Sequence, residues 1–228
     1  MKIIPRTNQI LKSNIYIIIL SLVFTTVFIN IAGLVLSSFI ENQEILNFSL
    51  ISFQQIVLIF ISFLFIKKQI IKITNPKLTL KKCLLIFFEI LKTYFYLMLF
   101  GVFLSILKLN FKISLPGFSE QQDILKLFPE SGPLFYMTII NATILAPILE
   151  EIIFRAGLLK NLMSKYSTYS SVIVSSLIFS LIHFQLEVFG ALFVISLLIS
   201  RLYIKTGTII APVLFHIINN SIKTIISL

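Results

Sequence analysis

Long, uninterrupted apolar runs dominate this sequence and restrict what it can fold into. Crossing the hydrocarbon core of a bilayer takes about 20 helical residues, and several of the runs reach that length. Of the 228 residues, 57% are hydrophobic and 12% are charged, which leaves too little polar surface to cover one or two soluble domains. We therefore predict an all-α fold, a polytopic bundle of transmembrane helices with about seven spans. The expected spans are 14–40, 48–66, 83–107, 132–160, 168–185, 188–204 and 208–227.

Basic residues predict how these spans are oriented. The chain has 19 Lys and Arg against 9 Asp and Glu, a net charge of +10 that can indicate nucleic-acid binding. Here the basic residues lie at the ends of spans and form no basic and aromatic patch, so we expect no nucleic-acid partner. Fourteen of them fall on one side of the predicted topology and four on the other. The N-terminus is therefore expected in the cytoplasm and the C-terminus outside. Because richness in Ile, Phe and Lys is typical of AT-rich genomes, we expect a multi-pass protein of a prokaryotic cytoplasmic membrane.

Ionisable side chains within the apolar spans indicate a functional site. The chain has two histidines, His183 and His216, and both lie in apolar spans. The pair Glu150-Glu151 lies in a third span. An ionisable residue at the middle of a transmembrane helix costs about 2.5–3.5 kcal/mol in insertion experiments, so such residues normally mark a pathway or a reactive site. Because four such groups occur together, a purely structural role for all of them is the weaker explanation. We therefore expect that they form a functional site.

The spacing of the acidic residues suggests how they divide their roles. Glu151 and Arg155 are i and i+4 in sequence, so they share a helix face and can form an ion pair. Glu150 points about 100° away around the same helix. We therefore predict that Glu151 and Arg155 support the site structurally and that Glu150 takes part in the chemistry.

The same spacing recurs on two other spans. His216 and Asn220 are i and i+4, so one face of the last helix presents an imidazole and a carboxamide together. Phe179 and His183 have this spacing on the fifth span, where the aromatic ring can pack beneath the imidazole.

Three other features have structural interpretations. Glu89 and Lys92, i and i+3 on the third span, are expected to pair with each other. Pro147, just before the two acids, can kink its helix and open space beside them. The stretch 108–131 is expected to connect two spans as a helix on the membrane surface.

Three short motifs resemble those of the CPBP family. EEIIFR at 150–155, FSLIH at 179–183 and HIINN at 216–220 are similar to its EExxxR, FxxxH and HxxxN motifs. These proteins are intramembrane peptidases that include the type II CAAX prenyl endopeptidases and the bacterial Abi proteins linked to bacteriocin immunity. The three motifs occur in order on successive apolar helices, within residues 132–224. The resemblance divides the chain into an N-terminal transmembrane region, 1–131, with three spans and an interfacial connection, and a catalytic transmembrane core, 132–228.

The resemblance implies an endopeptidase that hydrolyses a peptide bond of a membrane-associated protein or peptide. On the family pattern, Glu150 and His183 hold and deprotonate a water that attacks the scissile carbonyl. His216 and Asn220 stabilise the oxyanion that forms, a contribution that is often the largest single one in catalysis.

Metal use stays open at this point. The family is commonly described as metalloproteases, and Glu150, His183 and His216 can form a catalytic zinc set with one open position. However, the chain has no HExxH motif, and the three ligands would come singly from three helices. A glutamate-driven mechanism without metal needs no further ligand, and we prefer it.

Two other classes of protein can carry such a polar face. A non-catalytic bacteriocin-immunity or scaffold protein would keep the fold without turnover, although every motif residue is present here. A transporter would use the acidic and imidazole groups as a proton relay. The sequence has no internal repeat to support a transporter, and we keep both classes as alternatives to the peptidase.

Overall fold

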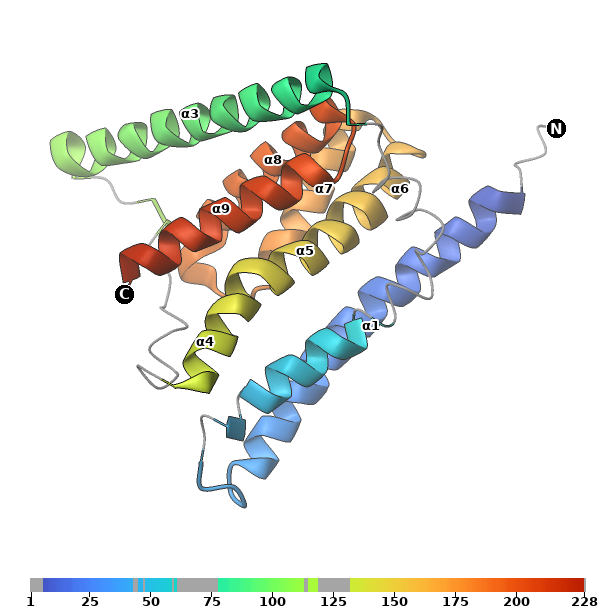
Figure 1. The fold of residues 1–228 in the computed structure, drawn as a ribbon, viewed down its shortest axis with the longest axis vertical. Coiled ribbons are helices and arrows are strands. Elements are labelled where there is room, and N and C mark those ends of the chain that lie inside the picture. The colour runs from blue at the N-terminus through green and yellow to red at the C-terminus, as the bar shows by residue number, and fades with distance from the viewer. Residues whose placement is uncertain are drawn as a thin grey trace. The chain divides into compact units, whose positions relative to one another are not determined.

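The described part of the chain is helical. The computed structural model describes residues 6–42, 45–46, 48–58, 60, 78–112, 115–118 and 132–227. These residues contain no strand, which confirms the predicted all-α fold (Figure 1). The elements, in chain order, are α1 (Arg6–Leu36), a helix at Phe48–Leu58, α3 (Leu80–Phe111), α4 (Pro133–Ile140), η2 (Asn141–Leu145), α5 (Ala146–Glu151), η3 (Ile152–Leu159), α6 (Lys160–Met163), α7 (Thr168–Leu181), η4 (Leu186–Val188), α8 (Phe189–Thr206) and α9 (Ile210–Ser227).

Each of the predicted spans overlaps a helix in its described residues. Three helical stretches are long and apolar enough to cross a membrane, namely Leu80–Phe111, Pro133–Met163 and Leu186–Thr206. Shorter apolar helices accompany them at Val23–Leu36, Phe48–Leu58, Thr168–Leu181 and Ile210–Ile226. Of the most apolar 18-residue segment of Leu80–Phe111, only 6% of the residues are buried inside the protein, as expected for a helix that faces lipid. The chain is therefore a helical membrane protein. Its predicted orientation stays a prediction, and most of the expected interfacial helix lies outside the described residues.

The chain forms two compact units. The first consists of Met1–Ile71, Asp123–Asn161 and Ile217–Leu228. The second consists of Lys72–Gln122 and Leu162–His216. Each unit contains residues from both of the regions, 1–131 and 132–228, that the motifs suggest. The division at residue 131 therefore stays a prediction.

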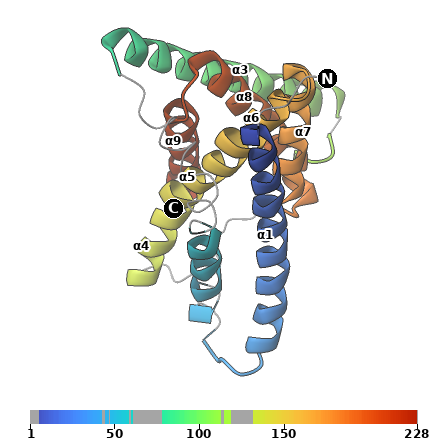
Figure 2. The same ribbon diagram turned by 90° about the vertical axis from the view of Figure 1, so that its right-hand side faces the viewer.

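In the first unit, α1 and the helix that follows it form a hairpin. Figure 2 shows the helix Phe48–Leu58 running back along α1. The side-chain amide of Gln54 donates a hydrogen bond of 2.8 Å from its Nε2 to the hydroxyl of Thr26 across the pair. Because a polar side chain in a bilayer needs a partner, this bond helps to hold the two helices together. The helix α1 also contacts η3 in the same unit.

In the second unit, small residues allow α7 and α8 to pack closely. Ser171, Ser175 and Ser180 are buried on α7, and Ser196 and Ser200 are buried on α8. Small side chains let the backbones of membrane helices approach each other, which increases dispersion contacts where the hydrophobic effect contributes little.

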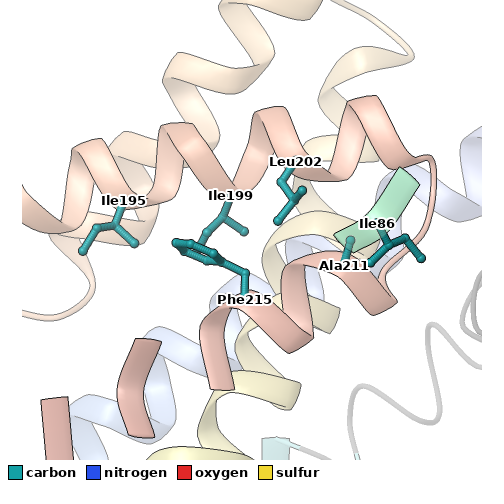
Figure 3. Packing of buried hydrophobic residues seen from close by; sticks show 6 residues of the cluster. All are labelled: Ile86, Ile195, Ile199, Leu202, Ala211 and Phe215. Atoms are coloured by element: carbon teal, nitrogen blue, oxygen red, sulfur yellow. The ribbon is translucent and has the colours of Figure 1, made fainter. Parts of the chain in front are cut away.

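The helices α3, α8 and α9 meet in an apolar cluster within the same unit (Figure 3). The rings of Tyr94 and Phe215 lie 4.7 Å apart between their centroids, at an angle of 43°. Phe215 directly precedes His216, so this packing holds the part of α9 that carries the imidazole. The cluster consists of Ile86, Ile195, Ile199, Leu202, Ala211 and Phe215.

An ion pair joins α3 to α8 and corrects one prediction. Glu89 does not pair with Lys92, as the i, i+3 spacing suggested. Its Oε2 instead lies 3.0 Å from a guanidinium nitrogen of Arg201, which also lies over the ring of Tyr96. Because α8 packs along α3, it brings a planar guanidinium into reach, whereas the side chain of Lys92 is exposed.

Candidate active site

Glu150 lies in one continuous helical stretch, from Pro133 to Met163, whose hydrogen-bond pattern changes along its length (Figure 1). The α-helix α4 passes into the π-helix η2, then into α5, the π-helix η3 and finally α6. In a π-helix each N–H donates to the carbonyl five residues earlier instead of four, and such turns are frequent at functional sites. Glu150 and Glu151 end the short α-helical part between the two π-helical segments.

Pro147 provides the physical reason for the first π turn. The proline has no N–H and cannot complete an α-helical turn. The N–H of Ala146 donates to the carbonyl of Asn141, which is the π-helical pattern. Next to Pro147 the helix therefore has a turn that contains one additional residue, and the kink expected there stays a prediction. In a bilayer, such a change of register is one of the few ways to keep backbone groups hydrogen-bonded next to a proline.

The two adjacent glutamates have different surroundings. The side chains of Glu151 and Arg155 are both 0% exposed, with 3.1 Å between Oε2 and Nε. The ion pair predicted from their spacing is therefore present. Glu150 is only partly buried. Because buried charges must be paired whereas a base must reach its substrate, these environments fit a structural Glu151 and a reactive Glu150.

His183 lies just beyond the end of a helix rather than within one. The predicted span 168–185 is helical only as far as Leu181, where α7 ends. Phe184 adopts a left-handed conformation with a φ of 53°, which turns the chain away from the helix axis. The boundary was predicted too far along because the sequence stays apolar through the turn, and no glycine marks the helix end.

The end of α7 determines how the imidazole of His183 is oriented. The backbone N–H of His183 donates to the carbonyl of Ser180, with 3.4 Å between nitrogen and oxygen, instead of continuing the α-helical pattern. The Nδ1 atom of His183 lies 2.7 Å from that carbonyl oxygen. A carbonyl oxygen can only accept, so Nδ1 carries the hydrogen, and Nε2 of a neutral imidazole keeps its lone pair. The side chain can therefore accept a hydrogen bond from a water molecule at Nε2.

Phe179 brings the two histidines to one aromatic ring. Its ring centroid lies 4.7 Å from that of His183, which confirms the predicted packing at i and i+4. It lies 6.3 Å from the ring of His216, in an edge-on arrangement. His216 is buried on α9, whereas His183 is partly exposed.

Asn220 contacts a backbone group that sequence reasoning did not identify. Its Nδ2 donates a hydrogen bond of 3.1 Å to the carbonyl oxygen of Ala142, in the π-helix η2. The residue lies one turn after His216 on α9. A backbone carbonyl leaves no mark in a sequence, and the only available signal was the proline five residues later, at 147.

The predicted site residues are distributed over both compact units. The second unit contains His183 and His216 around Phe179. The first unit contains Asn220 and Glu150. Glu150 belongs to the same helical stretch as the buried ion pair of Glu151 with Arg155. Helix α9 is continuous and carries both His216 and Asn220.

Zinc is the metal that the sequence left open. Within the described ranges, no group of three or more His, Cys, Asp or Glu side chains is placed to hold a metal ion. The mechanism proposed below follows the metal-free alternative that the sequence favours, and zinc binding stays a prediction to be tested.

Comparison with known proteins agrees with the motifs. Residues 132–222 match the family described as type II CAAX prenyl endopeptidase Rce1-like. An Escherichia coli protein named "Uncharacterized 24.3 kDa protein" is 29% identical over 121 residues, which are 50% of this chain and 54% of that protein. A Bacillus subtilis (strain 168) protein named "Putative membrane peptidase YdiL" is 32% identical over 92 residues, 40% of this chain and 38% of that protein. The chain thus spans about half, or less, of the relatives that it matches. No solved structure matches it. The resemblance drawn from the three motifs is confirmed for residues 132–222.

Proposed function

We propose that this chain, whose residues 132–222 match the Rce1-like family, is an intramembrane endopeptidase that cleaves a membrane-associated protein or peptide. The observation that carries the proposal is the extent of that match, which includes Glu150, His183, His216 and Asn220 in a helical membrane protein. The local geometry of these four residues supports distinct roles for them.

Glu150 and His183 activate the attacking water in this proposal. A carboxylate oxygen of Glu150 and Nε2 of His183 both accept hydrogen bonds, so together they can bind the two hydrogens of one water molecule. The oxygen lone pair of that water then faces the scissile carbonyl. Glu150 takes the proton as the bond to carbon forms, and it later delivers that proton to the leaving amine. The bond from His183 to the end of α7 supports this role because it keeps the hydrogen on Nδ1.

His216 and Asn220 stabilise the oxyanion that forms on the substrate carbonyl. A primary amide has two N–H donors, and the bond from Asn220 to Ala142 uses one of them. The second N–H of Asn220, together with an N–H of the His216 imidazole, can donate to the oxyanion. Removing one such donor typically lowers kcat by about 10²–10³-fold.

Glu151 and Arg155 support the site without touching the substrate. Both are completely buried against each other, so their charges are compensated inside the helical stretch that carries Glu150. A carboxylate next to Glu150 would oppose a second negative charge if it had no cationic partner. The ion pair therefore allows two adjacent acids to coexist in an apolar surrounding.

The test is cleavage of a quenched-fluorescent peptide library by the purified protein in detergent, with and without a chelator. We expect cleavage by the wild type, its loss in Glu150→Gln and its persistence with chelator. Glu187→Gln changes an exposed glutamate in η4 and is the matched control, for which we expect wild-type cleavage.

Other outcomes would change the proposal. Full cleavage by Glu150→Gln would reject the assignment of the base, and loss of cleavage with chelator would reject the metal-free mechanism. A folded wild type that cleaves neither the library nor native membrane proteins would reject the peptidase and favour the immunity, scaffold or transport alternatives.

A further inference from the structure

The carbonyl of Ala142 has no donor in the helix to which it belongs. In an α-helix this oxygen would accept from the N–H of Ala146, but that N–H donates to Asn141. In a π-helix it would accept from residue 147, which is a proline and has no N–H. The π-helical pattern therefore leaves this one carbonyl without a helical N–H donor, in a part of the chain where water is scarce.

The side chain of Asn220 supplies the missing donor. Its Nδ2 lies 3.1 Å from the Ala142 oxygen, and both residues belong to the first compact unit. The side chain thus takes the place of the N–H that Pro147 lacks. Because an unsatisfied backbone carbonyl is costly in an apolar medium, this bond stabilises the π turn against other arrangements of the same segment.

The π turn determines the direction in which Glu150 points. A π turn contains one residue more than an α-helical turn, so it shifts every later residue by one position around the helix. One position corresponds to about 100°. If η2 returned to the α-helical pattern, Glu150 would take the direction that Glu151 now has, relative to α4. The carboxylate that is now partly exposed would then point toward the buried side.

We propose that Asn220 is a positioning residue, which holds the π turn at Pro147 and thereby keeps Glu150 rather than Glu151 directed at the reacting water. This inference rests on the proposed peptidase function and adds to the role of Asn220 at the oxyanion. It makes the carboxamide a link between the helix of His216 and the helix of Glu150.

A double-mutant cycle between Asn220→Ala and Pro147→Ala tests this link. Asn220→Ala leaves the Ala142 carbonyl without a donor, and Pro147→Ala restores a backbone N–H that can serve it. We expect Asn220→Ala to lower both the melting temperature and kcat, with KM unchanged. Adding Pro147→Ala should return most of the melting temperature and raise kcat about tenfold over Asn220→Ala alone. The activity is measured well below the melting temperature and per folded molecule, so that a general loss of stability does not affect it.

Asn219→Ala is the matched control. Asn219 is buried on α9, whereas Asn220 is partly buried, and the two side chains point about 100° apart. We expect the effects of Asn219→Ala to be independent of Pro147→Ala. Additive melting shifts for Asn220→Ala and Pro147→Ala would overturn the proposal. A double variant whose kcat stays at the value of Asn220→Ala would also overturn it. If the wild type cleaves nothing while the melting shifts remain coupled, the peptidase is rejected but the link between Asn220 and Ala142 stands.

Discussion

The Nδ1 atom of His183 lies 2.7 Å from the carbonyl oxygen of Phe179, at the point where helix α7 ends. A helix end leaves carbonyls without donors, and here an imidazole satisfies one of them. The negative end of the helix dipole is close to the same ring and favours a hydrogen on Nδ1. The way in which α7 ends in the folded chain thus sets which nitrogen of His183 keeps its lone pair.

Two substitutions of His183 separate its structural bond from its chemical role. In His183→Asn, the side-chain amide can still donate to the Phe179 carbonyl, but nothing replaces Nε2. We expect a melting temperature close to that of the wild type and a loss of cleavage of at least about 10²-fold. His183→Ala should lose cleavage and also about 1 kcal/mol of stability. Thermal unfolding and peptide cleavage of both variants measure this, and wild-type activity in His183→Asn would contradict the assignment.

The buried pair of Glu151 and Arg155 predicts a strongly non-additive effect on stability. Removing either charge alone, as in Glu151→Gln or Arg155→Met, leaves the other buried without its partner and should cost about 3–5 kcal/mol. Combining Glu151→Gln with Arg155→Met removes both charges and should cost clearly less than the two single changes together. Glu150→Gln is the control and should hardly change the melting temperature, since Glu150 is partly exposed. Additive losses would show that the two side chains do not interact energetically.

The pairing of Glu89 can be tested against the partner that its spacing suggested. Because Glu89 contacts Arg201, the changes Glu89→Gln and Arg201→Gln should be coupled by about 0.5–3 kcal/mol in a double-mutant cycle. The side chain of Lys92 is exposed, so Lys92→Gln should show no coupling with Glu89→Gln. The measurement is thermal unfolding of all variants in one detergent. Coupling to Lys92 instead of Arg201 would contradict the packing of α3 against α8.

Two glycines predict opposite effects of the same substitution. Gly117 has a φ of +81°, and a Cβ atom there would lie 2.6 Å from the backbone nitrogen of Gly190. Gly117→Ala should therefore destabilise the protein by at least about 1–2 kcal/mol. Gly101 lies within α3 with open space around it, so Gly101→Ala should stabilise the helix by about 0.5–1 kcal/mol. Melting temperatures that shift in the same direction would argue against the turn at Gly117.

Much of the candidate site could be predicted because the relevant contacts are local. The ion pair of Glu151 with Arg155 and the packing of Phe179 against His183 both join residues at i and i+4. The period of a helix brings such residues together whatever the rest of the chain does. The positions of the helices were predictable for a similar reason, since a bilayer requires an apolar stretch of a certain length wherever the chain crosses it.

The features that could not be predicted depend on donors from distant parts of the chain. Glu89 has its nearest basic residue in sequence at 92, yet it pairs with Arg201 because α8 packs along α3. Likewise, Pro147 indicated a disturbed helix but not the register that follows from it. That register leaves the Ala142 carbonyl to a side chain from α9, and no short-range rule could identify Asn220 as the donor.

The sequence by itself determined that this protein is a bundle of apolar helices carrying paired acids, two histidines and an asparagine at helical spacings. These properties depend only on hydropathy and on the period of the helix. The tertiary structure alone decided how Pro147 is accommodated, where α7 ends and which nitrogen of His183 keeps its lone pair. The physical reason is that each buried backbone group must find a donor or an acceptor, and only the folded chain shows which one is within reach.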